Sequence, residues 1–149
     1  MSAARALLVS CGEPAMSGAL DAYQAARLPG WSVERVLVPG GCWWLAEVAS
    51  AGRLKKLIAS RGSAFEAVSE MLSGGNVSLI TLVGHQDCQW YRERFPGDSP
   101  GDLVRRIGKD LYAARDEIRR IAGRPLEISG DMLIRGANGL LEPRRLFPS

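Results

Sequence analysis

Residues 77–88 read VSLITLVGHQDC, and this stretch decides the fold class. Its first seven residues are almost entirely apolar and rich in β-branched side chains, which is typical of a strand buried on both faces of a parallel sheet. The stretch ends in Gly84, His85 and Cys88, so the only histidine of the chain stands three residues before a cysteine. It therefore predicts a central strand that delivers two potential metal ligands to one edge of a sheet.

Strands and helices alternate on both sides of this stretch. The other predicted elements are a strand at 6–10, a weak helix at 17–28, a strand at 33–38, a helical region at 54–72 interrupted at Gly62-Ser63, a helix at 99–123, a strand at 126–135 and a hairpin turn at Asn138-Gly139 that leads into Leu140-Leu141. Strands separated by helices favour a parallel sheet with right-handed crossovers. We therefore predict an α/β fold.

Two of the helix starts carry capping signals. The residues SPGD at 99–102 combine an N-cap serine, a proline at the first helical position and an early acidic residue, and the helix runs to Gly123. One face of this helix is apolar, and we interpret the basic residues on the opposite face as a solvated surface rather than an anion-binding one. Ser63 and Glu66 form a capping box, which predicts a separate helix that begins there.

Length and composition favour one domain that spans residues 1–149, because 149 residues with 46% hydrophobic content can bury a single core. The net charge of +3 arises from scattered residues of both signs, so we expect no nucleic-acid partner. No apolar run approaches the roughly 20 residues of a membrane span. The residues LVSC at 8–11 resemble a lipoprotein cleavage site, but the apolar stretch before them is shorter than the roughly 7–15 residues of a signal peptide.

The cysteines at positions 11, 42 and 88 are too few and too widely spaced for a disulfide framework, and we expect a reducing, cytoplasmic compartment. Cys11 follows the first predicted strand, whereas His85 and Cys88 follow the third. Because the carboxyl ends of parallel strands share one edge, these side chains could meet there and offer the soft ligand set of a tetrahedral zinc site. Taken alone, His-x-x-Cys also fits a loop histidine beside an unrelated thiol.

The two segments that carry these residues resemble motifs of the β-class carbonic anhydrases. In that family a first strand ends in Cys-x-Asp-x-Arg and a later one in Gly-His-x-x-Cys; here they read CGEPA at 11–15 and GHQDC at 84–88. The resemblance implies a three-layer fold with a central, mostly parallel sheet of four to five strands flanked by helices. It also implies Zn²⁺ as cofactor, Cys11, His85 and Cys88 as metal ligands, and reversible hydration of carbon dioxide to bicarbonate by zinc-bound hydroxide.

The acid-base residues of the family motif differ in this chain. Glu13 stands where the family has its catalytic aspartate, and Ala15 stands where the family has the arginine that holds this carboxylate away from zinc. Glu13 could therefore keep the catalytic role, or it could become the fourth zinc ligand and close the site. Arg92 or Arg94 is a candidate to supply the missing charge. The alternative function is a catalytically impaired zinc-binding relative with a structural or regulatory role.

A second departure follows the predicted strand at 33–38, where the family has Arg-Asn-Ala-Gly and this chain has VPGG at 38–41. We interpret Cys42 as a buried small hydrophobic residue, against the alternatives of a spare metal ligand or a redox partner of Cys11 in a thiol redox protein. We interpret Trp43 and Trp44 as interface or core aromatics. The family resemblance implies a homodimer or a higher homo-oligomer.

Overall fold

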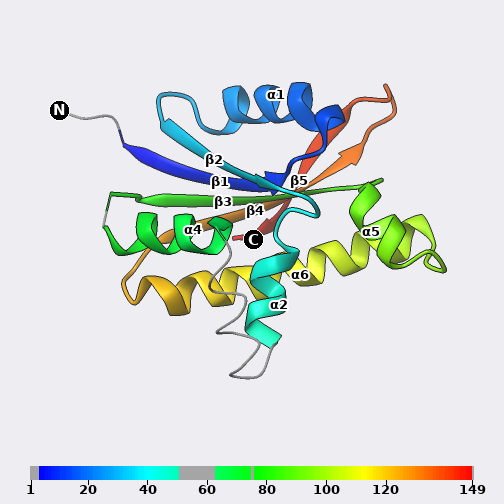
Figure 1. Cartoon of the computed structure of the whole chain (residues 1–149). Coiled ribbons are helices and arrows are strands. Elements are labelled where there is room, and N and C mark those ends of the chain that lie inside the picture. Colours follow the sequence, from blue (N-terminus) through cyan, green and yellow to red (C-terminus); the bar gives the residue numbers. More distant parts are fainter. Residues whose placement is uncertain (1–3, 51–62, 75, 149) are drawn as a thin grey trace.

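The computed structural model describes residues 4–50, 63–74 and 76–148, with the backbone alone for residues 47–50 and 63–67. The elements in chain order are β1 (Arg5–Cys11), the 3-10 helix η1 (Pro14–Met16), α1 (Ser17–Arg27), β2 (Ser32–Val38), α2 (Trp43–Ser50), α4 (Ser63–Ser73), β3 (Leu79–His85), α5 (Gln89–Arg94), α6 (Pro100–Ala122), β4 (Glu127–Arg135) and β5 (Leu141–Phe147). Figure 1 shows their arrangement.

One five-stranded sheet forms the centre of the molecule, in the order β2-β1-β3-β4-β5. The first four strands in this order are parallel, and β5 joins β4 as an antiparallel hairpin strand. This confirms the predicted α/β fold with a mostly parallel sheet. The chain moves outward from β1 to β2 and then returns to place β3 on the other side of β1, so the topological switch point lies between β1 and β3.

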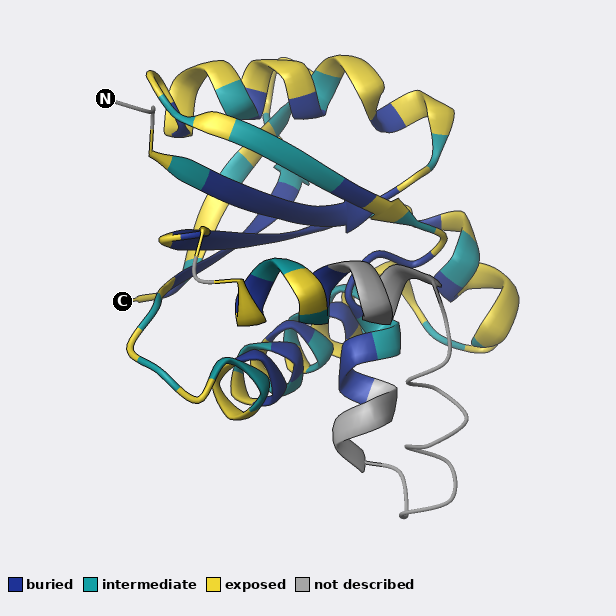
Figure 2. Cartoon of the chain, turned by 60° about the vertical axis from the view of Figure 1, so that its left-hand side comes forward, coloured by how far each residue is buried: buried dark blue, intermediate teal, exposed yellow. Residues whose placement is uncertain are grey.

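Helices cover both faces of the sheet and make three layers (Figure 1). Helix α1 lies alone on one face, and α2, α4 and α6 lie on the other. The alternation along β1 explains this, because Ala6 and Leu8 pack in the cluster under α1 while Leu7 and Val9 pack in the cluster under α6. Figure 2 shows the consequence: β1 and β3 are buried, and α1 exposes its outer surface.

Helix α6 begins and ends as predicted. The Ser99 hydroxyl accepts a hydrogen bond from the Asp102 N–H, and Gly123 closes the helix in the left-handed conformation at φ 60°. Gly84 of β3 lets this helix lie close to the sheet, because a Cβ there would stand 2.6 Å from the Ile107 side chain. Among the helices that the structure describes, none combines the length and the hydrophobicity of a membrane span.

The sequence patterns did not predict two short helices, which lie next to the candidate site described below. Helix α2 begins at Trp43, directly after a glycine turn, and α5 occupies the six residues after Cys88. The predicted helical pattern at 54–58 and the side chains of the Ser63–Glu66 capping box lie outside the described residues, although α4 does begin at Ser63. Six to eight residues contain too few turns for an apolar periodicity to be recognised.

Candidate metal centre

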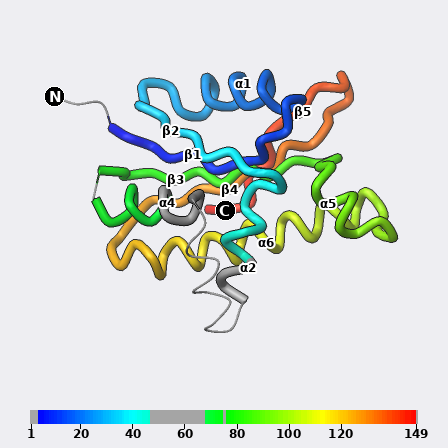
Figure 3. The backbone as a smooth tube through the Cα atoms, in the orientation of Figure 1, coloured from blue at the N-terminus to red at the C-terminus, as the bar shows by residue number. Residues whose placement is uncertain are grey.

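The switch point of the sheet brings the two sequence motifs together. Cys11 is the last residue of β1 and His85 the last residue of β3, and these strands are direct neighbours. Cys88 precedes α5 as its N-cap residue in extended conformation. Between the two ligands of the second motif, Asp87 takes a positive φ of 60°, which reverses the chain. Figure 3 follows the chain as it leaves β3 toward α5.

Four side chains converge at this point: Cys11, Glu13, His85 and Cys88 each place one potential ligand atom within 4.8 Å of the others. The two sulfur atoms of Cys11 and Cys88 are 3.9 Å apart. Cys11, His85 and Cys88 are almost fully buried, and Glu13 is half-buried at the opening. The structure thus brings together the residues that the sequence motifs singled out, and Glu13 joins them as a fourth potential ligand.

The histidine presents an unused nitrogen to the sulfur atoms. Its Nδ1 lies 2.8 Å from the carbonyl oxygen of Gln86. Its Nε2 is buried and makes no hydrogen bond of normal geometry within the described part of the chain. A buried polar atom without a partner costs about 1–3 kcal/mol, so each one calls for an explanation. The arrangement therefore fits a ring nitrogen reserved for a metal ion.

The charges of the cluster favour thiolate at Cys11. The hydrogen bond from the Cys88 thiol, together with His85, lowers the pKa of Cys11 to about 4 against the opposing effect of burial. The same hydrogen bond and burial raise the pKa of Cys88. Burial lowers the pKa of His85, but the Cys11 thiolate and the Gln86 carbonyl raise it more, so that it lies above its usual value. The site thus stabilises negative charge on the Cys11 sulfur, as zinc requires of a cysteine ligand, while the Cys88 thiol keeps its proton in the absence of an ion.

The carboxylate of Glu13 is held by the backbone and not by an arginine. One of its oxygens accepts a hydrogen bond of 2.5 Å from the Gln89 N–H. Among the described residues it makes no ion pair, and neither Arg92 nor Arg94 supplies the missing charge. Arg94 instead lies over the ring of Trp90 at 4.6 Å. The suggestion that a nearby arginine replaces the family's partner is therefore wrong for these two residues.

The donor set suits zinc on chemical grounds. Two sulfurs and an imidazole nitrogen form a soft to borderline set that zinc takes in tetrahedral sites, and a carboxylate oxygen can complete it. Calcium and magnesium prefer oxygen ligands alone. The unpartnered Nε2 of His85 and the 3.9 Å separation of the sulfurs leave room for an ion between them. The residues present therefore fit a zinc ion, with Cys11, His85 and Cys88 as ligands and Glu13 beside them.

A small pocket of about 250 Å³ opens next to Glu13. Apolar surface makes up most of its wall, and its lining residues are Gly12, Glu13, Pro14, Pro39, Gln89, Trp90 and Glu93. Trp90 stacks on Trp43 with ring centroids 4.5 Å apart, which stiffens this wall. Sequence reasoning missed Gln89, Trp90 and Glu93; their position directly after Cys88 was the only available signal.

The glycine turn after β2 packs against the start of the site. Gly41 takes a φ of +67°, and a Cβ at this position would lie 3.1 Å from the backbone nitrogen of Cys11. The carbonyl of Val38 accepts hydrogen bonds from the N–H groups of both Gly12 and Gly41. The retained glycines thus give the close backbone approach that the sequence suggested.

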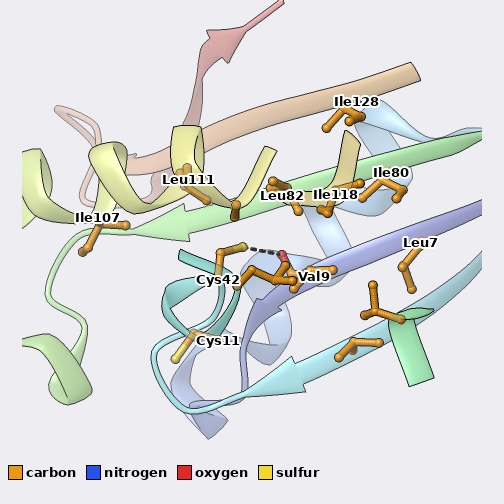
Figure 4. Packing of buried hydrophobic residues seen from close by; sticks show 14 of the residues in the cluster. Leu7, Val9, Cys11, Cys42, Ile80, Leu82, Ile107, Leu111, Ile118 and Ile128 are labelled. Atoms are coloured by element: carbon orange, nitrogen blue, oxygen red, sulfur yellow. Dashed lines mark hydrogen bonds between the residues drawn. The ribbon is translucent and has the colours of Figure 1, made fainter. Parts of the chain in front are cut away.

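Cys42 lies apart from the four converging side chains. It is buried in the core, where its thiol donates a long hydrogen bond of 3.8 Å to the Val9 carbonyl, and burial raises its pKa. In Figure 4 its sulfur points toward Val9, whereas the sulfur of Cys11 points away from this cluster. These features agree with the interpretation as a small buried hydrophobic residue. Trp43 and Trp44, both half-buried, pack against the same core.

No protein-family model matches the chain, and no curated protein sequence matches it. Solved structures do resemble it. One is a tetrameric β-carbonic anhydrase from Sordaria macrospora, with a TM-score of 0.52 and 16% identity over 99% of this chain and 82% of that one. Another is the β-carbonic anhydrase CafA of Aspergillus fumigatus, with a TM-score of 0.49 and 16% identity over 99% of this chain and 77% of that one.

At 16% identity these similarities concern the fold alone. The chain has a divergent fold of the β-carbonic anhydrase type, and a group of two cysteines, a histidine and a glutamate that could hold a metal ion lies at its switch point.

Proposed function

We propose that the chain is a zinc-dependent, carbonic anhydrase-like protein that hydrates carbon dioxide reversibly to bicarbonate. The observation that carries this proposal is the convergence of Cys11, His85 and Cys88 with Glu13, all ligand atoms within 4.8 Å of one another. The similar fold of the Sordaria enzymes supports it.

Zinc, when bound, supplies a hydroxide nucleophile at neutral pH because it lowers the pKa of a water molecule to near 7. The chain's own residues hold the ion and orient the reactants. Glu13 has one oxygen fixed by the Gln89 N–H, so its other oxygen is available to accept a hydrogen bond from the nucleophile. The apolar wall formed by Pro39 and Trp90 suits a small, uncharged substrate such as carbon dioxide.

The second candidate is a zinc site closed by Glu13. The observation that favours it is that the Glu13 carboxylate belongs to the converging group and has no arginine partner among the described residues. An unpaired carboxylate at this distance can ligate the ion itself and exclude water. The protein would then bind zinc and serve a structural or regulatory role without turnover.

Metal analysis and a stopped-flow assay of carbon dioxide hydration distinguish these candidates. The leading proposal predicts about one zinc per chain and hydration above the buffer rate. Glu13→Gln should then lower the hydration rate at least about tenfold with the zinc content unchanged, because general acid-base and orienting groups contribute at least that much. Glu127→Gln is the control: this exposed carboxylate stands at the start of β4, outside the pocket and outside the converging group, so the rate should stay within about twofold.

The cobalt-substituted protein separates an open site from a closed one. In the closed arrangement, azide changes the visible absorption of the Glu13→Ala variant but not that of the natural protein, and hydration stays at the buffer rate. In the open arrangement azide perturbs both. A natural protein that binds no zinc or cobalt would remove both candidates.

We also propose three broader properties of the protein. The chain acts as one domain, it resides in the cytoplasm, and it assembles into a homodimer or a larger homo-oligomer. The last is supported by the tetrameric state stated for the Sordaria enzymes. Analytical ultracentrifugation at micromolar concentration tests the assembly, and a sedimentation coefficient of a 16.1 kDa monomer would contradict it.

A further inference from the structure

We propose that Gln86 is a positioning residue that fixes the ring of His85 and uses the β4–β5 hairpin as its anchor. This inference rests on the proposed zinc site. Gln86 contacts none of the reacting groups, and its role is to hold the protonation pattern and the direction of the histidine ring.

The backbone of Gln86 sets which nitrogen of His85 carries the proton. Nδ1 lies 2.8 Å from the Gln86 carbonyl oxygen, and a carbonyl oxygen can only accept a hydrogen bond. Nδ1 is therefore the donor, and Nε2 is the nitrogen left to face Cys11 and Cys88. In metal sites, such a bond to the remote nitrogen fixes the tautomer and the orientation of the ring.

Gln86 is itself tied to β4 by two hydrogen bonds. Its N–H donates to the Leu133 carbonyl at 3.0 Å, and its side-chain oxygen Oε1 accepts from the Arg135 N–H at 2.5 Å. The side chain thus takes the place of the next carbonyl in the β3–β4 ladder, at the point where the main chain leaves the sheet. These two bonds fix Gln86, the residue whose carbonyl orients His85.

Arg135 extends this connection to the hairpin turn. Its guanidinium donates to the Gly139 carbonyl at 2.7 Å and lies 3.8 Å from the carboxylate of Asp87. Asp87 is the residue with positive φ that reverses the chain between His85 and Cys88. The end of β4 therefore supports the two residues between His85 and Cys88: it contacts Gln86 through two hydrogen bonds and Asp87 through the Arg135 guanidinium, which the hairpin turn holds at Gly139.

The Gln86→Leu variant tests this role, because leucine keeps the size of the side chain but cannot accept the bond from Arg135. Gln86→Glu retains an acceptor oxygen and serves as the rescue. Gln24→Leu is the matched control, since Gln24 also accepts one bond through its side-chain oxygen, from Arg35 at 2.9 Å, on the remote helix α1.

Zinc affinity by chelator competition is the first readout. Gln86→Leu should lose about tenfold or more in affinity, as outer partners of metal ligands usually contribute 10- to 100-fold. Gln86→Glu and Gln24→Leu should stay within about threefold of the natural protein. The second readout is solvent exchange of the Nδ1 proton in the zinc-loaded protein, which NMR can follow without overlap because the chain has one histidine. This exchange should accelerate at least about tenfold in Gln86→Leu alone.

A Gln86→Leu variant with natural affinity and natural exchange overturns the positioning role while leaving the zinc proposal intact. A natural protein that binds no zinc overturns both. If Gln86→Leu and Gln24→Leu lose affinity equally, the effect is one of general stability, and the positioning role is likewise rejected.

Discussion

Two buried polar clusters lie in this sheet, and they differ in whether their members satisfy one another. Under α1, the fully buried Asp131 accepts from Tyr23 at 2.5 Å and from Arg145 at 2.9 Å, and Thr81 joins the same Tyr23 hydroxyl at 2.8 Å. Each of these side chains has a partner. At the ends of β1 and β3, by contrast, the Nε2 of His85 has none of normal geometry within the described residues.

The difference separates a structural network from a candidate ligand site. A buried network whose donors and acceptors pair with one another connects α1 and the edge strand β5 to the centre of the sheet, and it needs no further component. A buried group of thiols and an imidazole with an unused ring nitrogen needs a further component, such as a metal ion, to satisfy that nitrogen. We therefore expect substitutions in the first cluster to change the stability of the fold, and substitutions in the second to change metal binding.

The largest effect should follow from removing one sulfur of the metal cluster. Cys88→Ala should weaken zinc binding by more than about 100-fold, or about 2.7 kcal/mol, because the loss of a ligand exceeds the loss of an outer partner. Competition with a chromogenic chelator measures it. Cys42→Ala, which removes a buried thiol outside the cluster, should leave the zinc affinity unchanged. Equal losses in the two variants would contradict the distinction between these cysteines.

A smaller effect is expected when the charge partner of Asp131 is removed. Arg145→Met leaves a fully buried carboxylate with the tyrosine alone, and we expect a loss of about 2–3 kcal/mol in the free energy of unfolding, somewhat below the usual cost because Arg145 is itself partly exposed. Urea denaturation measures it. Arg144→Met, at the exposed neighbouring position, should cost less than about 0.5 kcal/mol. Neither variant should alter the zinc content.

The smallest effect concerns the Tyr23 hydroxyl. Tyr23→Phe should cost about 1–2 kcal/mol of stability, because Asp131 and Thr81 each lose a buried partner. Tyr112→Phe removes a more exposed hydroxyl that donates to the Leu146 carbonyl at 2.9 Å, and it should cost less.

The Tyr23 hydroxyl should also make the stability of the natural protein depend on pH, in a direction that its pKa shift defines. Burial and the hydrogen bond to Asp131 raise the pKa of Tyr23 in the folded protein. The stabilisation is therefore complete below the unfolded pKa of about 10 and is lost as the pH rises further. The natural protein should lose stability between about pH 10 and 11 more steeply than Tyr23→Phe. Parallel pH profiles would show that this hydroxyl does not couple to folding.

Much of the secondary structure could be predicted because its signals are local. The apolar run before His85 predicted β3, and Ser99 and Gly123 marked the ends of α6 to within a residue. The short helices α2 and α5 were missed since they form where neighbouring elements hold them. Their aromatic residues Trp43 and Trp90 stack on one another across 46 intervening positions of the chain, which no local pattern indicates.

The strands, the longer helices and the residues at the strand ends follow from the amino-acid sequence alone, because hydrophobic periodicity and capping act over a few residues. What those residues contact depends on the tertiary structure. It places β1 beside β3, so that the sulfur atoms of Cys11 and Cys88 lie 3.9 Å apart. It also makes the Gln89 N–H, and not an arginine, the hydrogen-bond partner of the Glu13 carboxylate. Such contacts depend on strand pairing between distant segments, and the free energy that selects the pairing comes from the whole buried core.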